Sequence, residues 1–366
     1  MWLAVFAVSI IAGIAGVIYL AGKIEKSGLF YRIESRAVTM SLAFVMVLAI
    51  VVILCFVFDI TNTIVIVTNV AVFLLAGDLV GYILRHMSVG VSPRIVDLVA
   101  ILACVVYFCI GWYLMHGLWE TDYDIVTDKD IGTIKVAQIA DSHVGCGFDG
   151  EGFGERLSKI QASAPDILVI TGDFIDDSTS KEDMISACAA LGRFRAGYGI
   201  YFSFGNHDRG YYSDSRRGYG GDDLIAELEK NGVTVLEDES VLVDNRCYVI
   251  GRRDDDYGRT QRMSASELIE GLDKSKYMIM LDHQPTDYDA EAASGVDLVL
   301  SGHTHGGQLW PLEYIQPLVS KNDRVRGYEK RGNTGFIVTD GISDWAIKFR
   351  TGCKSEYNII NITSSK

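Results

Sequence analysis

The sequence has no surplus of basic residues. It holds 33 Lys and Arg against 47 Asp and Glu, for a net charge of −14. Basic and acidic residues balance over the first 120 positions, so residues 121–366 carry the whole negative charge. Non-specific nucleic-acid binding needs a basic surface that displaces counterions. We therefore expect no nucleic-acid partner, and an acidic soluble domain kept apart from its copies by self-repulsion.

The sequence also lacks a cysteine framework. None of its seven cysteines forms a C-x-x-C pair. Three lie in apolar runs, and the other four (Cys146, Cys188, Cys247 and Cys353) are scattered. This spacing excludes a zinc knuckle and a set of structural disulfides, and leaves open one disulfide between two of the scattered residues.

Charge is almost missing from four long apolar stretches, at residues 2–22, 37–58, 60–84 and 97–118. A helix of about 20 such residues crosses the hydrocarbon core of a bilayer. The first stretch has no basic region before it and three more follow, which favours a retained span over a cleaved signal peptide. We expect a four-helix transmembrane domain over residues 1–120 and a soluble domain over residues 121–366, joined by a link near residues 121–130.

Basic residues in the loops predict the orientation of the spans. They fall only after the first span and after the third, and those loops should be cytoplasmic. The soluble domain then lies on the outer face of a multi-pass cell-membrane protein. The six residues are Lys23, Lys26, Arg32, Arg36, Arg85 and Arg94.

Asp78 is the only charged residue within the third apolar stretch. A carboxylate at that depth is costly and usually faces protein or water. It lies within Gly77-x-x-x-Gly81, a spacing typical of helix packing. Two interpretations remain: a hydrogen-bonded packing residue, or a polar contact to a lipid headgroup.

The soluble domain alternates short apolar runs with amphipathic stretches, which predicts a layered α/β fold. We expect strands at residues 134–140, 167–171, 200–204, 248–251, 277–281, 298–301, 336–339 and 357–362. We expect helices at residues 154–164, 181–194, 222–231, 264–272 and 287–293.

Five of the expected strands end in carboxylate, amide or imidazole side chains. Carboxyl ends of strands are where open α/β sheets place their ligands. All five histidines after residue 120 lie in these segments, which is hard to explain by packing. The segments are Asp141-Ser142-His143, Gly172-Asp173-Phe174-Ile175-Asp176, Gly205-Asn206-His207-Asp208, Asp282-His283 and Gly302-His303-Thr304-His305.

These ligand types predict a metal centre. Carboxylate, amide and imidazole ligands without thiolate suit manganese, iron or zinc better than a structural zinc site. His303 and His305 are two residues apart, so on extended backbone they point the same way and could each hold one ion of a pair. We expect two divalent ions, with manganese first and iron or zinc as alternatives.

The five segments, in this order, resemble the calcineurin-like metallophosphoesterase superfamily over about residues 134–362. The form Gly302-His303-Thr304-His305-Gly306-Gly307-Gln308 resembles a bacterial branch of exported cell-wall phosphoesterases, membrane-tethered relatives and some UDP-diacylglucosamine pyrophosphatases. The resemblance implies a four-layer β-sandwich flanked by helices. The chain departs from the common pattern at Ser142 and at Thr351-Gly352-Cys353-Lys354. The second departure means that the resemblance does not predict the rim of the site near residues 351–354.

The resemblance also implies roles for the site residues. Asp173 would bridge the two metals, His207 would face the phosphoryl group as an acid or charge stabiliser, Asp208 would orient His207, and Asp176 would support the ligands. The first metal would be held by Asp141, His143, Asp173 and His305, and the second by Asp173, Asn206, His283 and His303.

The expected function is a membrane-anchored phosphoesterase that cleaves phosphodiester or pyrophosphate bonds with a metal-bridging hydroxide. The bilayer and a phosphoester or lipid-diphosphate substrate are its expected partners, with lipid-linked or cell-envelope compounds favoured. Alternatives are a phosphodiesterase for soluble nucleotides that is merely tethered, and a metal-dependent receptor or sensor module.

A loop rich in glycine, tyrosine and arginine follows His207 and Asp208, at residues 210–221. It is either a solvated loop or a substrate rim. In the second interpretation Arg209, Arg216 or Arg217 would clamp a further phosphate.

Overall fold

The computed structural model describes residues 2–211, 214–255 and 261–365, without the side chains of residues 2–6 and 215. The chain divides into two compact units, Met1–Ile110 and Gly111–Lys366.

Among the described residues, four helices are long and apolar enough to cross a membrane, as the sequence predicts. A single residue, Asp59, links the second and third, and its side chain accepts a hydrogen bond from Asn62 N at 2.9 Å. The helices are α1 (Trp2–Lys26), α2 (Arg36–Phe58), α3 (Ile60–His86) and α4 (Pro93–His116).

Small residues bring the helices of the first unit close together. A side chain at Gly77 of α3 would lie 3.2 Å from Ala100 of α4, so this glycine sits in a helix contact. Asp78 accepts hydrogen bonds from Lys23 Nζ at 2.8 Å and from Tyr19 Oη at 2.6 Å. The carboxylate is hydrogen-bonded to protein, as in the first interpretation of Asp78, but its side chain is 49% exposed and so is not packed in the interior of the unit.

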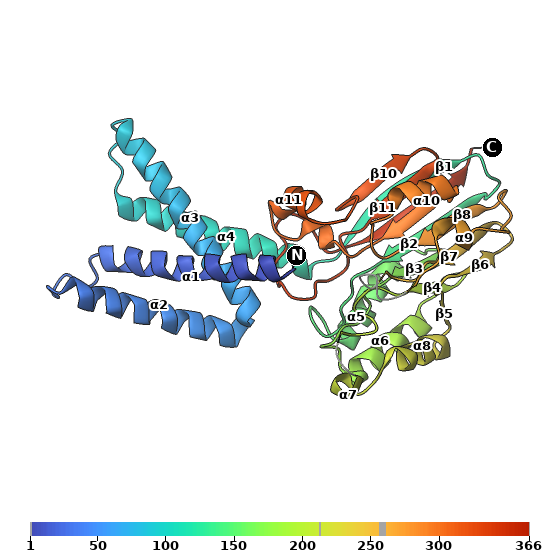
Figure 1. Cartoon of the computed structure of the whole chain (residues 1–366), viewed down its shortest axis with the longest axis horizontal. Coiled ribbons are helices and arrows are strands. Elements are labelled where there is room, and N and C mark those ends of the chain that lie inside the picture. The colour runs from blue at the N-terminus through green and yellow to red at the C-terminus, as the bar shows by residue number, and fades with distance from the viewer. Residues whose placement is uncertain (1, 212–213, 256–260, 366) are drawn as a thin grey trace. The chain divides into compact units, whose positions relative to one another are not determined.

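The second unit contains two six-stranded sheets (Figure 1). The first sheet has the order β1-β12-β2-β3-β4-β5 and the second β10-β11-β9-β8-β7-β6. The first sheet is formed by β1 (Trp119–Thr127), β12 (Glu356–Ser364), β2 (Thr133–Ile139), β3 (Ile167–Thr171), β4 (Ile200–Ser203) and β5 (Val233–Val235). The second is formed by β10 (Gly327–Arg331), β11 (Thr334–Val338), β9 (Leu298–Ser301), β8 (Tyr277–Leu281), β7 (Cys247–Gly251) and β6 (Glu239–Val243).

Three apolar cores separate four layers of structure. The middle core joins the two sheets and includes Val136, Val169, Ile279 and Leu300. One outer core lies between the first sheet and α5 (Gly150–Gln161), α6 (Lys181–Arg193) and α8 (Gly221–Lys230). The other lies between the second sheet and α9 (Ala265–Leu268) and α10 (Tyr288–Ser294). Central strands such as β3, β8 and β9 are buried on both faces, which is why they read as continuous apolar runs.

The expected link near residues 121–130 is wrong, because most of it is strand β1. This strand pairs in parallel with β12 along its whole length. Its residues alternate between half-buried and exposed, and Tyr123 and Ile125 pack against the middle core. The helix expected at residues 264–272 is also shorter than predicted, since α9 ends at Leu268.

Candidate metal centre

The five polar segments follow β2, β3 and β4 of one sheet and β8 and β9 of the other. Five non-glycine residues in the turns have positive φ: Asp141 (53°), His143 (39°), Asp173 (53°), His303 (71°) and His305 (49°). Residues other than glycine rarely adopt positive φ, because the side chain then clashes with the backbone. Residues that do so are held in this conformation by their surroundings, and they often mark functional sites. The loops after β2 and β3 hold each other, because Asp141 N donates to Gly172 O at 3.0 Å and His143 N to Asp173 O at 3.1 Å.

Two glycines of these segments make room for the carboxylates. A Cβ atom at Gly205 would lie 2.3 Å from Asp173 Oδ1, and one at Gly302 would lie 2.5 Å from Asp141 Oδ2. Any side chain at either position would push a carboxylate out of place. The glycines before Asn206 and His303 are therefore required by the close approach of neighbouring loops.

Asp141, His143 and His305 form what we call the first ligand group. One potential ligand atom from each residue lies within 4.8 Å of the other two. Asp141 Oδ1 lies 3.6 Å from His305 Nε2. All three residues are buried, so the group is removed from bulk water.

Asp173, His283 and His303 form the second ligand group, again with potential ligand atoms within 4.8 Å of one another. Asp173 Oδ2 lies 3.1 Å from His283 Nε2 and 3.7 Å from His143 Nε2 of the first group. The same carboxylate oxygen thus stands between imidazoles of both groups, the position that a bridging ligand needs.

Several buried polar atoms at the centre lack a hydrogen-bond partner among the described residues. They are both ring nitrogens of His143, Nε2 of His283 and Oδ1 of Asn206. Leaving a buried polar atom unpaired costs about 1–3 kcal/mol. Nitrogen and oxygen lone pairs that converge without donors fit bound cations, so the residues present suit divalent metals.

Contacts behind the first group include two buried carboxylates and one backbone carbonyl, because His305 Nδ1 also forms a hydrogen bond with Ser343 O at 3.3 Å. His143 Nδ1 lies 3.4 Å from Asp176 Oδ2, at ion-pair distance but without hydrogen-bond alignment. His305 Nδ1 lies 2.9 Å from Asp344 Oδ1. Arg350 in turn donates to both oxygens of Asp344, at 2.7 and 3.0 Å, and is fully buried. Such outer contacts fix the orientation of a ligating imidazole and raise its basicity.

Contacts behind the second group are made by neutral groups. His283 Nδ1 lies 2.8 Å from Thr171 O. In the neutral ring, which is the form that binds a metal, a proton on Nδ1 leaves the Nε2 lone pair facing Asp173. Asn206 Nδ2 donates to Tyr211 Oη at 2.5 Å, which turns Oδ1 of the amide the other way. Asn206 Oδ1 is thereby free to act as the amide ligand that the sequence predicts.

Charges at the centre are strongly coupled. Burial of Asp141 raises the pKa of its carboxyl group. Burial of His303 and the positive charge of the neighbouring His283 lower the pKa of His303 to about 3. Burial is outweighed at Asp173, where His283 and His207 hold the pKa well below its usual range. At His143 burial lowers the pKa, but the carboxylates of Asp176 and Asp173 outweigh it and raise the pKa to about 9. Cations bound here would displace imidazole protons, so metal binding would be linked to pH.

His207 lies beside the ligand groups rather than in either of them. Its ring centroid is 5.0 Å from that of His143, and its backbone N donates to Asp173 Oδ1 at 2.9 Å. Burial, together with the charge of His143, lowers the pKa of His207 to about 4. The ring is therefore neutral at pH 7 until an anionic group comes close to it.

Asp208 has a different task from the expected one of orienting His207. Its carboxylate is fully buried and accepts hydrogen bonds from four backbone amides, of Asp173, Phe174, Ile175 and Gly205. The oxygens are used by these amides rather than by an imidazole. Asp208 therefore ties the loop after β4 to the loop after β3 and positions Asp173 through the backbone.

Of the three arginines expected at a substrate rim, two have other partners and one is exposed. Arg217 is 8% exposed and donates to the carbonyls of Asp208 and Arg209, so it cannot clamp an incoming phosphate. Arg209 is paired with both oxygens of Glu237, at 2.8 and 2.9 Å. Arg216 is exposed on α7 (Asp214–Arg217). Residues 212 and 213 of this loop lie outside the described residues.

Four further residues at the site were not predicted. Tyr211 and Trp345 flank the ring of His207, with centroids 4.9 and 5.6 Å away, and both are partly exposed. Asp344 and Arg350 support His305. The strand-end rule could have indicated Asp344, because it follows β11 by only a few residues.

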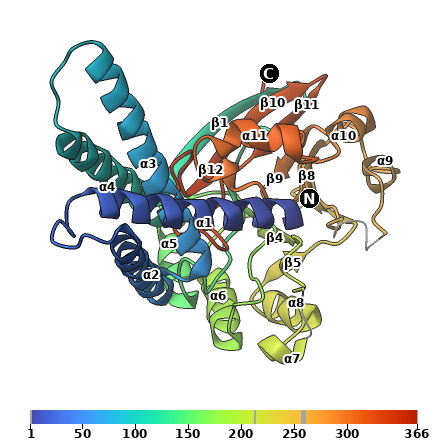
Figure 2. The same ribbon diagram turned by 60° about the vertical axis from the view of Figure 1, so that its left-hand side comes forward.

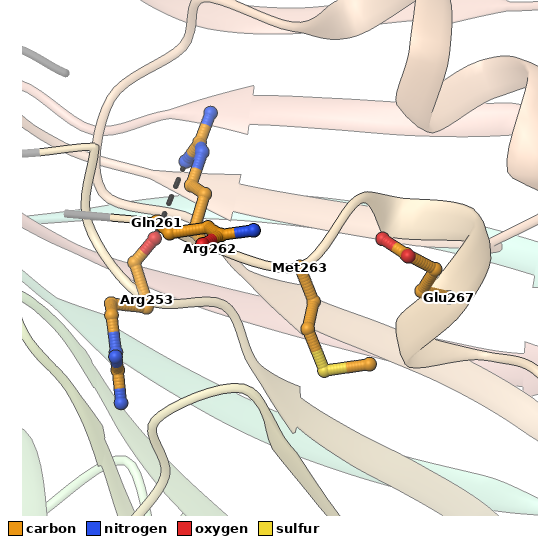
Figure 3. A pocket seen from close by; sticks show the side chains of 5 residues that line it. All are labelled: Arg253, Gln261, Arg262, Met263 and Glu267. Carbon is orange, nitrogen blue, oxygen red and sulfur yellow. Dashed lines mark hydrogen bonds between the residues drawn. The ribbon is translucent and has the colours of Figure 1, made fainter.

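An open pocket of about 500 Å³ lies outside the two ligand groups (Figure 3). It is lined by Arg253, Gln261, Arg262, Met263 and Glu267, none of which belongs to a ligand group. Arg262 Nη1 lies 3.0 Å from Asp282 Oδ1, so this carboxylate is held by arginine and turned away from the ligands. His283, the next residue, provides the ligand atom of this segment.

Known proteins resemble this chain over the same region. Residues 134–307 match the family model described as calcineurin-like phosphoesterase. An uncharacterised metallophosphoesterase of Aquifex aeolicus is 35% identical over 209 residues, which are 55% of this chain and 76% of that protein. An uncharacterised metallophosphoesterase of Campylobacter jejuni is 29% identical over 238 residues, 64% of this chain and 60% of that protein.

A relative that also has a membrane part is the transmembrane protein with metallophosphoesterase domain of Bos taurus. It is 27% identical over 244 residues, which are 62% of this chain and 52% of that protein. The matched segment thus spans less than two thirds of the Campylobacter and Bos relatives. Together with the α/β fold and the two ligand groups, these likenesses show that the chain belongs to the calcineurin-like metallophosphoesterase family.

Proposed function

We propose that the chain hydrolyses phosphodiester or pyrophosphate bonds with two divalent ions, on lipid-linked or cell-envelope substrates at the outer face of the membrane. The observation that carries the proposal is the position of Asp173 Oδ2 between His283 Nε2 and His143 Nε2. One carboxylate that faces imidazoles of two groups supports two ions with a shared ligand rather than one isolated ion.

The donor set names the residues that would hold each ion. Bound ions would supply a water of lowered pKa as nucleophile and would stabilise charge on the phosphoryl oxygens. The ions would be held by Asp141, His143, His305 and Asp173 at one site, and by Asp173, Asn206, His283 and His303 at the other. Manganese is our first choice of metal, with iron or zinc next, because oxygen and imidazole ligands without thiolate suit all three.

The chain's own residues have two tasks in the reaction. Asp208 and Arg217 hold the loop after β4 against Asp173, which keeps Asn206 and His207 in place. His207 holds a proton on its ring nitrogen beside the leaving oxygen. An approaching phosphate anion raises the low pKa of this ring, so protonation and substrate binding assist each other.

The membrane unit supports the choice of substrate. Four apolar helices keep the catalytic unit at a bilayer, where lipid-linked phosphoesters are concentrated. The excess of Lys and Arg in the loops after α1 and α3 favours an outer-face catalytic unit. A protease added to intact cells should therefore cleave the catalytic unit, and protection of that unit until the cells are lysed would contradict this orientation.

A substrate panel tests the reaction. Full-length protein in nanodiscs is loaded with Mn²⁺, Fe²⁺ or Zn²⁺ and offered lipid diphosphates, a soluble nitrophenyl phosphodiester and soluble nucleotides. We expect two ions per chain and turnover highest on the lipid diphosphates. Equal or faster turnover of soluble nucleotides would favour a tethered phosphodiesterase instead, and binding of only one ion would refute the dinuclear centre.

A further inference from the structure

Helix α11 (Leu312–Val319) has its polarity reversed relative to a normal surface helix. Surface helices of soluble proteins turn an apolar stripe inward and polar residues outward. Here no residue of the helix is buried, and the polar Glu313 and Gln316 are its least exposed side chains. The apolar side chains point out instead, with exposed fractions of 39% for Leu312, 42% for Ile315 and 82% for Leu318.

Contacts on the polar side fix this orientation. Glu313 Oε2 lies 3.6 Å from Arg326 Nη1, and Arg326 also pairs with the buried Asp340. The backbone of Glu313 lies so close to Gly307 that a Cβ atom there would be 2.6 Å from Glu313 Cα. The helix therefore rests its polar side on the turn that carries His305, and it lies outside both sheets (Figure 1, Figure 2).

Hydrogen bonds connect the start of α11 to the end of a membrane span. The catalytic unit begins at Gly111, so the last turn of α4 belongs to it. Arg350 N donates to Gly111 O at 3.0 Å, and the next residue, Thr351, donates to Gln308 O at 2.9 Å. Trp310 N in turn donates to Thr351 Oγ1 at 3.2 Å. Within this unit, the entry to α11 is thus tied to the point where α4 ends.

Exposed aromatic residues mark the same region. In the last turn of α4, Trp112 is 43% exposed and Tyr113 is 66% exposed. Next to and within α11, Trp310 is 61% exposed and Tyr314 is 67% exposed. Tryptophan and tyrosine concentrate where a membrane meets water, because their rings are apolar with a polar edge. A binding site for a protein partner would not require exposed aromatic residues both at α11 and at the end of a membrane span.

We propose that α11 lies in the membrane–water interface, with Leu312, Ile315, Leu318 and Val319 among the acyl chains. Interfacial helices have an apolar face that enters the boundary of headgroups and chains and a polar face that stays out. The partner is the lipid surface in which the spans already lie. Because α11 rests on the turn that carries His305, it holds the ligand groups at the level of the headgroups, a consequence that rests on the function proposed above.

Photocrosslinking of the full-length protein tests the location of α11. Benzoylphenylalanine replaces Leu318 or, as a matched control, Leu242 of β6, which is 42% exposed. The proteins are placed in nanodiscs of phosphatidylcholine and phosphatidylglycerol and irradiated. We expect lipid adducts at position 318 to exceed those at position 242 by on the order of tenfold. Equal adducts at the two positions, or adducts of position 318 with a second chain, would overturn the proposal.

A second measurement separates the membrane contact from the proposed substrate. Leu318→Asp removes no buried contact, because Leu318 is 82% exposed, so its unfolding temperature should match that of the unaltered protein. Turnover of a lipid diphosphate should fall on the order of tenfold in Leu318→Asp but not in Leu242→Asp, because a charge weakens interfacial binding. Turnover of a soluble nitrophenyl phosphodiester should not change in either. Absence of lipid turnover in the unaltered protein would refute the substrate class alone, whereas absence of lipid adducts at position 318 would refute the position of α11 alone.

Discussion

The two ligand groups use the same residue types but are supported in different ways. In the first group, buried carboxylates stand behind the imidazoles, Asp176 behind His143 and Asp344 behind His305. At the second group, neutral dipoles support the ligands. The carbonyl of Thr171 lies behind His283, and the hydroxyl of Tyr211 lies behind Asn206, which we propose as a further ligand of this group.

This difference has a consequence for metal binding. A carboxylate behind an imidazole increases the negative charge that the metal meets, whereas a carbonyl or hydroxyl only orients the ligand. The first group should therefore hold its ion more tightly than the second. Loss of metal in a graded chelator titration should begin at the second group.

The largest expected effect is loss of both ions in Asp173→Ala, because this side chain faces both groups. Activity should fall by more than the roughly 10²–10⁴-fold that is typical when only a proton-transfer group is lost. Metal analysis after gel filtration measures this, with Asp289→Ala as the control because Asp289 is 96% exposed. Two ions still bound to Asp173→Ala would show that the groups do not share this ligand.

Next in size is His207→Ala, which should keep both ions and lose kcat by about 10²–10⁴-fold. The side chain belongs to neither group but lies beside the first. Metal content and kcat are measured on the same sample. Full turnover in a sample with two ions would exclude a role in proton transfer or charge stabilisation, and loss of one ion would make His207 a ligand.

A smaller and more selective effect is expected for Asp344→Asn. The change removes the negative charge behind His305 and should weaken metal binding at the first group by about 10–100-fold. Binding at the second group should not change, which reverses the expected order of metal release. Two-site titration by calorimetry checks this against Asp289→Asn, and equal weakening of both sites would show that the two groups are not independently supported.

The smallest effect is expected for Tyr211→Phe. It removes the hydroxyl that accepts from Asn206 Nδ2, a hydrogen bond worth about 0.5–1.5 kcal/mol, so affinity at the second group should fall a few-fold. Tyr328→Phe on β10 is the matched control, since Tyr328 is 39% exposed and belongs to neither ligand group. A loss confined to the first group would contradict the assignment of Asn206 to the second.

The outline of the fold could be predicted because it depends on local patterns. The buried strands β3, β8 and β9 are short apolar runs in the sequence itself. Strand β1 was missed because acidic residues alternate with its inward-facing Tyr123 and Ile125, so its partner β12 is needed to recognise it. Helix α5 begins earlier than expected, since Asp149 caps it by accepting a hydrogen bond from Gly152 N at 2.8 Å.

The candidate ligands could be predicted for a similar reason, because each directly follows a strand. Their supports could not be predicted in this way. Asp344 lies 39 residues after His305 in the chain, and Arg350 reaches Asp344 only within an irregular loop. Arg217 looked like a surface cation but is buried by the backbone carbonyls around it.

The sequence by itself determined the four apolar helices, the alternation of strands and helices, and the residues that come to the ends of the strands. These features follow from hydrophobic periodicity and chain direction, which are local. Only the tertiary structure decided which carboxylate stands behind which imidazole, what Asp208 and Arg217 contact, and that α11 turns its apolar side outward. These depend on how loops from two packed sheets meet, and contacts between distant segments leave no periodic trace in the chain.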